Sequence, residues 1–133
     1  MDCIFCKIAK GEMPSSKIYE DENSYAFLDI KPNNPGHTLL IPKIHARNIF
    51  DIPHDTLCAL MDPLKKISHA VKDAMDASGI NIAMNNEPSA GQIVFHAHIH
   101  IIPRFDGDHM RHKTFTAEEM SGFAEKISAA LKP

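Results

Sequence analysis

The chain has 133 residues, of which 44% are apolar, so it can form one hydrophobic core, and we expect a single domain over residues 1–133. Its 14 basic and 17 acidic residues give a formal charge of −3, which argues against a protein held to nucleic acid by a basic surface. No apolar run approaches the roughly 18–20 residues of a membrane span. The N-terminus lacks a secretory pattern, so we expect a cytoplasmic protein with reduced thiols that binds neither nucleic acid nor membranes.

Turn residues and apolar patterns predict the elements in chain order. Strands are expected at residues 17–20, 24–30, 38–42, 80–85 and 95–102, the first three as an antiparallel meander. Helical patterns cover residues 3–10, 55–77 and an amphipathic tail from Thr116. Pro63 should kink the long helix or divide it in two, and Gly79 should end it. The helices form an insertion and a tail and do not alternate with strands, which favours an α+β fold.

Three of the nine histidines, His96, His98 and His100, alternate with apolar residues. In a strand this alternation places all three on one face. The pattern allows an exposed polar face, a metal site using two of the rings with outside ligands, or catalysis on a phosphate. In catalysis the imidazoles would serve as nucleophile, hydrogen-bond donor and proton source. One ion cannot bind all three on a straight strand, because the outer pair would lie about 13 Å apart.

Cysteine is used in a way that argues against disulfides. There are three cysteines, an odd number, and Cys3 and Cys6 form a C-x2-C pair. Such a pair can bind one zinc ion through two thiolates, if two further ligands come from elsewhere. The alternative is that both are small buried apolar residues. A redox role is disfavoured, because no βαβ pattern surrounds the pair.

The pattern His-φ-His-φ-His-φ-φ at residues 96–102 resembles the signature of the histidine-triad (HIT) superfamily of nucleotide hydrolases and transferases. Further blocks are similar to the family in order and spacing: Cys3-Ile-Phe-Cys6-Lys-Ile8, Pro14, Phe27-Leu-Asp-Ile30, Pro35-Gly-His37, Ile41-Pro-Lys43, Asn85 and Gly91-Gln92. The resemblance implies a HIT-type antiparallel sheet with a long helix and a C-terminal helix. It also implies a homodimer whose sheets join across the two-fold axis.

The resemblance implies catalytic roles for four residues. The middle histidine of the triad, His98, would attack the α-phosphorus of a nucleotide and form a covalent nucleotidyl-histidine intermediate that water hydrolyses. His100 would contact the phosphate, and His37 would support the histidine cluster. Gln92 would hydrogen-bond the bridging or leaving-group oxygen.

The resemblance also implies a nucleotide pocket. Asp29 would accept hydrogen bonds from the two ribose hydroxyls, as acidic residues do in dinucleotide sites. Asn85 would contact the phosphate side. An apolar base pocket for a purine, with adenosine first, would be lined by Phe5, Ile8, Phe27 and Ile30. The sequence departs from many relatives at Ile93, where they carry a Ser or Thr that donates a hydrogen bond.

In relatives that begin with C-x2-C, two histidines complete a Cys2His2 site. The corresponding ligands here are Cys3, Cys6, His45 and His96. Because all four positions of a tetrahedral zinc would be filled, this zinc would be structural, and no catalytic metal is required.

The activity expected from the resemblance is hydrolysis of a nucleoside 5′-monophosphate ester, anhydride or phosphoramidate at the α-phosphorus. One alternative is a dinucleoside polyphosphate hydrolase, which shares the triad but differs in the leaving group. Another is a nucleotide-binding or zinc-binding interaction module with little turnover.

Overall fold

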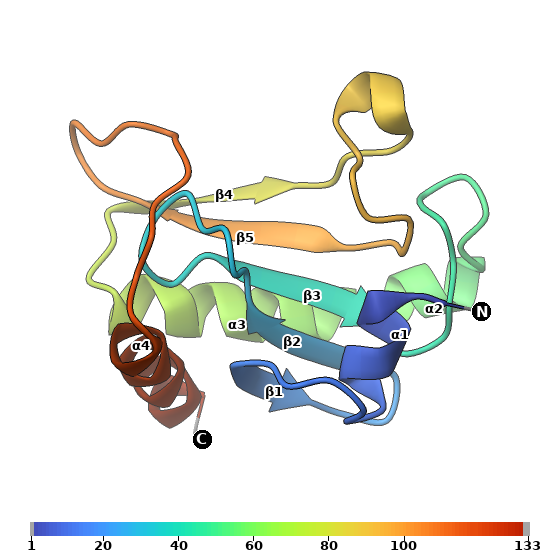
Figure 1. The fold of residues 1–133 in the computed structure, drawn as a ribbon, viewed down its shortest axis with the longest axis horizontal. Coiled ribbons are helices and arrows are strands. Elements are labelled where there is room, and N and C mark those ends of the chain that lie inside the picture. Colours follow the sequence, from blue (N-terminus) through green and yellow to red (C-terminus); the bar gives the residue numbers. More distant parts are fainter. Residues whose placement is uncertain (1, 132–133) are drawn as a thin grey trace.

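A computed structural model describes residues 2–131 and confirms the α+β fold. A single antiparallel sheet has the strand order β1-β2-β3-β5-β4 (Figure 1). Its strands are β1 (Lys17–Glu20), β2 (Ser24–Leu28), β3 (Thr38–Pro42), β4 (Gly79–Ala83) and β5 (Ile99–Arg104). The helices are α1 (Ile4–Ala9), α2 (His54–Ala59), α3 (Met61–Ala74) and α4 (Ala117–Ala130), with a short 3-10 helix, η1 (Pro88–Ala90). Within residues 2–131, no helix has the length and hydrophobicity to span a membrane.

Both faces of the sheet are covered, which is why β2 and β3 are buried at every position. Side chains alternate between the faces along a strand. Leu28 and Leu40 pack with α3 and α4 in the larger core, which also contains Ile127 of α4. Phe27 and Leu39 pack on the opposite face under α1 (Figure 1). The short helix α1 therefore defines a second, smaller apolar layer.

The strand register places the last histidine of the triad on the α1 face. Phe27 pairs with Leu39, and Leu39 pairs with His100 on β5. Directly paired residues share one face of a sheet. The catalytic candidates are thus expected on the side of the sheet that α1 covers.

The long helical pattern is divided in two, as Pro63 predicts. Helix α2 ends at Ala59 and α3 begins at Met61, so Pro63 falls in the first turn of α3, where its missing N–H breaks no helical hydrogen bond. Gly79 does not end the helix, contrary to the sequence-based expectation. Helix α3 ends at Ala74, and Asp76 takes the left-handed turn with a φ of 53°.

The last strand begins later than the sequence predicts, at Ile99 instead of residue 95. Continuing the register of Leu40 with Ile99 would place Ala97 opposite Pro42. Pro42 has no N–H to donate, and its carbonyl accepts from the His96 ring at 2.9 Å. The Ala97 N–H instead donates to the carbonyl of Ala46, at 2.8 Å. The first two triad histidines therefore lie just outside the strand ladder.

Candidate functional site

The backbone fixes the tautomer of His98. Its Nδ1 lies 2.7 Å from the carbonyl oxygen of His96. A carbonyl can only accept, so Nδ1 carries the hydrogen and Nε2 keeps its lone pair. Burial lowers the pKa of His98, which keeps the ring neutral at pH 7. A neutral imidazole with a free Nε2 lone pair can act as a nucleophile.

A second set of hydrogen bonds fixes the tautomer of His100. The Asn33 backbone N–H donates to His37 Nδ1 at 3.0 Å, so neutral His37 must carry its hydrogen on Nε2. That Nε2–H donates to His100 Nδ1 at 2.9 Å. His100 therefore carries its own hydrogen on Nε2. The His98 and His100 ring centroids are 5.0 Å apart, so a ring with a free Nε2 lone pair is the neighbour of a ring with an Nε2–H.

Burial is the main electrostatic influence on this cluster. It lowers the pKa of His37 to about 4 and also lowers the pKa of His100. The Asp29 carboxylate, 3.6 Å from His37 Nε2, opposes this effect by favouring the charged ring. All three imidazoles are nonetheless neutral at pH 7. Asp29 thus lies next to His37, which in turn contacts His100.

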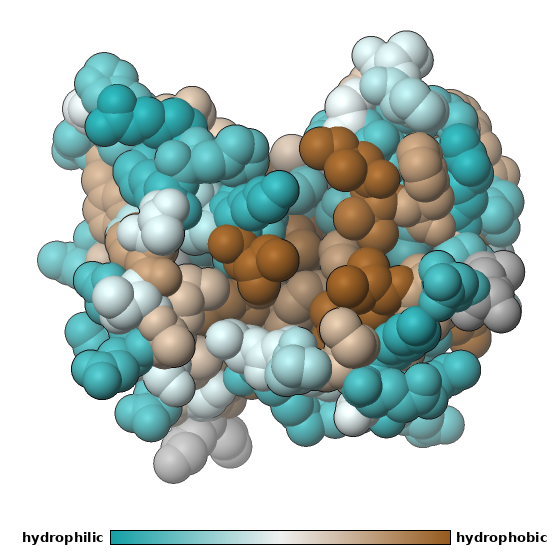
Figure 2. Space-filling model, in the orientation of Figure 1, coloured by the Kyte–Doolittle hydropathy of each residue, from teal (hydrophilic) through white to brown (hydrophobic). Residues whose placement is uncertain are grey.

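Three of the residues expected to form the base pocket, Phe5, Ile8 and Phe27, belong to one buried apolar cluster next to His98, and Ile30 is not part of it. Phe5 packs edge-on against both Phe27 and His98, with each pair of ring centroids 5.3 Å apart. Phe5, Ile8 and Phe27 are buried, whereas Ile30 is 84% exposed. The space-filling view shows apolar side chains around a hollow on this face (Figure 2). The structure therefore brings an apolar surface next to the neutral histidines.

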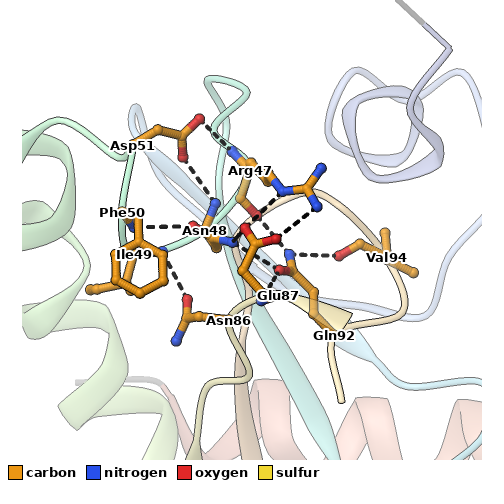
Figure 3. A network of polar contacts seen from close by, with 9 residues as sticks. All are labelled: Arg47, Asn48, Ile49, Phe50, Asp51, Asn86, Glu87, Gln92 and Val94. Atoms are coloured by element: carbon orange, nitrogen blue, oxygen red, sulfur yellow. Dashed lines mark hydrogen bonds and ion pairs between the residues drawn. The ribbon is translucent and has the colours of Figure 1, made fainter. Parts of the chain in front are cut away.

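Gln92 is held by the protein itself (Figure 3). Its Oε1 accepts from Asn48 Nδ2 at 3.0 Å and from the Glu87 backbone N–H at 2.8 Å. Its Nε2 donates to the carbonyls of Arg47 at 2.7 Å and Val94 at 3.1 Å. The amide has no N–H left for a substrate oxygen, so the expected contact with the bridging or leaving-group oxygen needs a correction. Gln92 instead fixes the loop that leads into the triad.

The same loop contains a strained residue that the sequence did not reveal. Glu87 has a φ of 82°, which is uncommon for a residue with a side chain. Its carboxylate accepts from Arg47 Nε at 2.9 Å, from Arg47 Nη2 at 3.0 Å and from Asn48 Nδ2 at 2.7 Å (Figure 3). These bonds hold the strained loop to the segment after His45. No local pattern links residues that lie about forty positions apart, so sequence reasoning missed Arg47, Asn48 and Glu87.

Asn85 lies at the start of this loop, half-buried beside Gly91. Gly91 has a φ of 91°, and a Cβ added to it would stand 3.5 Å from Asn85 Nδ2. The left-handed backbone favours glycine at this position, whereas the contact with the amide is of ordinary length.

Four side chains from three distant segments form a candidate metal centre. His96 Nδ1 lies 3.4 Å from Cys3 Sγ and 3.5 Å from Cys6 Sγ, and His45 Nδ1 lies 3.4 Å from Cys6 Sγ. A tetrahedral zinc with ordinary bond lengths separates sulfur and nitrogen ligands by about 3.6 Å. The His96 Nε2–H donates to the Pro42 carbonyl, so the lone pair of Nδ1 faces the thiols. The donor set therefore fits a Cys2His2 metal ion.

A second acidic and histidine group, Asp29, His37 and His100, has ligand atoms within 4.8 Å of one another. It does not fit a metal ion equally well. Both nitrogens of His37 are already hydrogen-bonded, to the Asn33 N–H and to the His100 ring. His37 is therefore engaged within the histidine cluster and has no free nitrogen for a metal ion.

Comparison with known proteins decides the family. A family model described as the HIT domain matches residues 10–107. The chain belongs to the HIT family. It is 42% identical over 108 residues to an adenosine 5′-monophosphoramidase of Candida albicans, covering 78% of this chain and 71% of that protein. It is also 42% identical over 107 residues to an adenylylsulfatase of Arabidopsis thaliana, covering 80% of this chain and 54% of that protein.

Solved HIT structures share the fold over nearly the whole chain. A Hit-like protein from Bartonella henselae has a TM-score of 0.91 at 43% identity, covering 97% of this chain and 96% of that one. A zinc-bound histidine triad family protein from Mycobacterium smegmatis has a TM-score of 0.88 at 40% identity, covering 98% and 94%. The five-stranded sheet and the C-terminal helix α4 thus belong to an architecture that these structures share.

The neutral state of His37 predicts a pH-dependent stability. Its pKa is about 4 in the folded protein against 6.5 ordinarily, so below pH 6.5 the unfolded chain binds more protons. The free energy of unfolding should therefore fall as the pH drops from about 6.5 to about 4, by up to about 1.4 kcal/mol per pH unit for this histidine. Urea unfolding at a series of pH values measures this loss.

The contribution of His37 is isolated by comparing His37→Asn with His69→Asn, since His69 is exposed on α3. The His37 variant should show a shallower pH dependence than the wild type, and the His69 variant should match the wild type. A His37 variant with the wild-type slope would contradict the assignment of a buried neutral ring.

Proposed function

We propose that this HIT protein hydrolyses nucleoside 5′-monophosphate derivatives, phosphoramidates and anhydrides, at the α-phosphorus. The observation that carries the proposal is the pair of fixed tautomers: a ring with a free Nε2 lone pair, His98, is the neighbour of a ring with an Nε2–H, His100. The relatives named as an adenosine 5′-monophosphoramidase and an adenylylsulfatase support a nucleotide substrate, with adenosine first.

The proposed chemistry has two steps. The lone pair of His98 Nε2 forms a bond to the α-phosphorus while the bond to the leaving nitrogen or oxygen breaks, and the leaving group takes up a proton from solvent. Water then attacks the phosphorus, the nitrogen–phosphorus bond breaks, and the proton returns to solvent with release of the nucleoside monophosphate. The His100 Nε2–H donates to a phosphate oxygen, where negative charge develops.

Binding of the nucleoside would use the residues next to the histidines. Asp29 accepts hydrogen bonds from the ribose hydroxyls, and the base packs on the apolar surface around Phe5, Ile8, Phe27 and Ile30. Asn85 contacts the phosphate side. On the leaving-group side the 84% exposed Ile93 has no hydrogen to donate, so a donor there must come from the backbone or solvent.

We also propose that zinc occupies the Cys2His2 group and has a structural role. Cys3, Cys6, His45 and His96 would fill all four positions, and the ion would cross-link three segments of the chain. This cross-link would fasten α1, which contains Phe5, to His96, two residues before the nucleophile. The zinc-bound relative supports the identity of the metal.

The proposal extends to the oligomeric state and the cellular location of the protein. We expect residues 1–133 to act as one domain and to form a homodimer whose sheets join. A cytoplasmic location fits the reduced thiols that the metal group requires.

Removing the nucleophile tests the activity. The wild type should release AMP from adenosine 5′-phosphoramidate, and His98→Ala should lower the rate by about a thousandfold or more, because neither His37 nor His100 offers a free Nε2 lone pair. His69→Ala on α3 is the matched control and should retain full activity. The measurement is AMP formation followed by chromatography.

The other outcomes discriminate between the alternatives. Equal AMP release by the wild type and His98→Ala would overturn the catalytic assignment. Hydrolysis of diadenosine polyphosphates alone would assign a different leaving group. Tight AMP binding without turnover of either substrate would indicate an interaction module.

Removing one thiol tests the metal centre. Cys6→Ser should lose the zinc that the wild type retains after dialysis, because a neutral hydroxyl is a far weaker ligand than a thiolate. Cys58→Ser is the matched control, since Cys58 is exposed on α2 and outside the group. Elemental analysis measures the zinc content. Equal zinc in wild type and Cys6→Ser would refute the ligand set.

A further inference from the structure

The segment that follows β5 crosses the turn between β2 and β3 (Figure 1). We call residues 105–113 the strap. The HIT family model ends at residue 107, so most of the strap lies beyond it. The turn under the strap, residues 31–36, contains the peptide group that donates to His37. The strap therefore contacts the turn that holds His37, and does not contact the nucleophile His98 through these bonds.

Lys113 holds this turn at several points. Its backbone N–H donates to the Pro32 carbonyl at 2.7 Å. Its ammonium group donates to the Asn33 carbonyl, to Asn34 Oδ1 at 2.9 Å and to the His109 carbonyl at 3.0 Å. Hydrogen bonds from a charged donor are stronger than neutral ones. One residue thus fixes the backbone of the turn and the conformation of the strap.

Asn34, in the turn, forms hydrogen bonds with the end of β5 and with the strap. Its side chain is almost fully buried, and its Nδ2 donates to the Pro103 carbonyl and to Asp108 Oδ2, both at 2.8 Å. Arg104 Nη2 holds Asp108 at 2.6 Å. The turn, the end of β5 and the strap are therefore one hydrogen-bonded unit.

A continuous path of hydrogen bonds leads from this unit to His100. The Pro32 carbonyl and the Asn33 N–H belong to the same peptide group, so a donor on that carbonyl strengthens the N–H as a donor. The Asn33 N–H donates to His37 Nδ1, and the His37 Nε2–H donates to His100 Nδ1. The order of donors along the path permits only the Nε2–H form of His100.

We infer that the strap is a positioning element that selects the Nε2–H tautomer of His100, with Lys113 as its main positioning residue. Its effect on catalysis rests on the proposed function, whereas the tautomer itself does not. If His37 took the other tautomer, His100 would have to donate from Nδ1. Its Nε2 lone pair would then face the anionic phosphate and repel it.

Other charged groups around His37 do not replace this control. Asp29, 3.6 Å from His37 Nε2, also favours a hydrogen there, but in the proposed complex its carboxylate accepts from the ribose. His98 and His100 are neutral. His112 belongs to the strap itself, with its ring Nδ1 3.0 Å from the Lys31 carbonyl. With the nucleotide bound, the Asn33 N–H is the group that keeps the hydrogen of His37 on Nε2, and so the hydrogen bond to His100 in one direction.

The test uses Lys113→Met, which keeps the length of the side chain and the backbone N–H on the Pro32 carbonyl. It removes the ammonium contacts that hold the Asn33 carbonyl and the Asn34 side chain, and with them the position of the Asn33 peptide group. Nitrogen-15 NMR of the histidine rings distinguishes the two tautomers directly. In the wild type, His37 and His100 should be entirely in the Nε2–H form, and in the variant both should become mixtures. His98 is an internal control, because its tautomer is set by the carbonyl of His96 and should not change.

Kinetics on adenosine 5′-phosphoramidate add the second readout. Lys113→Met should lower kcat about tenfold and also raise KM, because the Nε2–H of His100 meets the phosphate both in the bound substrate and in the transition state. Arg111→Met is the matched control, since Arg111 is an exposed cation of the same strap that is not among these contacts. It should match the wild type in both readouts.

Two results would overturn the inference. In one, His37 and His100 keep the wild-type tautomers in Lys113→Met. In the other, the tautomers mix and kcat does not fall. A change at His98 as well would show general loss of structure, and Lys113→Arg, which keeps the charge, would then have to restore the wild-type tautomers for the inference to stand. If the wild type hydrolyses no nucleotide, the proposed function fails, and the NMR result alone decides the role of the strap.

Discussion

Backbone hydrogen bonds determine the chemistry of this site, because each one fixes which nitrogen of an imidazole carries the hydrogen. The Pro42 carbonyl takes the N–H of His96, and the His96 carbonyl takes the N–H of His98. The Asn33 N–H occupies one nitrogen of His37 and leaves the other to donate. These backbone groups belong to strand ends and turns, so the fold itself sets the tautomers. Neutral imidazoles that exchange freely between their two tautomers would lack such a definite arrangement of donors and lone pairs.

Burial explains why so many partners are needed. Withdrawing the rings from water lowers their pKa values and keeps them neutral, which a nitrogen nucleophile requires. The same withdrawal makes an unpaired N–H costly, by about 1–3 kcal/mol for each group. The cover that α1 provides and the dense set of hydrogen bonds are therefore two aspects of one requirement.

Much of this arrangement could be predicted from local patterns in the sequence. The alternation of histidines predicts a shared face, and the C-x2-C pair predicts two neighbouring thiols, because both depend on spacings of two or three residues. The predicted start of the last strand was wrong. The observed start depends on Pro42 and on a hydrogen bond to the Ala46 carbonyl, and no local spacing in the sequence indicates either.

Long-range partners account for the other errors. The expected substrate contact of Gln92 could not be judged without Asn48, which lies 44 residues earlier and fills one of its hydrogen-bond positions. The role of Lys113 was equally hidden, since its partners are about eighty residues away in a turn that looks ordinary in sequence. Side chains that act by holding a distant backbone leave no periodic signal.

The cysteine and histidine group can be completed only late in the synthesis of the chain. Cys3 and His96 are 93 residues apart, so the two halves of the group meet only after most of the chain has left the ribosome. Until then His45 is the one histidine of the group that the N-terminal thiols can meet, and the fourth ligand position is not filled. Closing so long a loop costs considerable chain entropy, which a cross-link at this point removes from the unfolded state. His96, which is synthesised late, thus anchors α1, the first helix to be made.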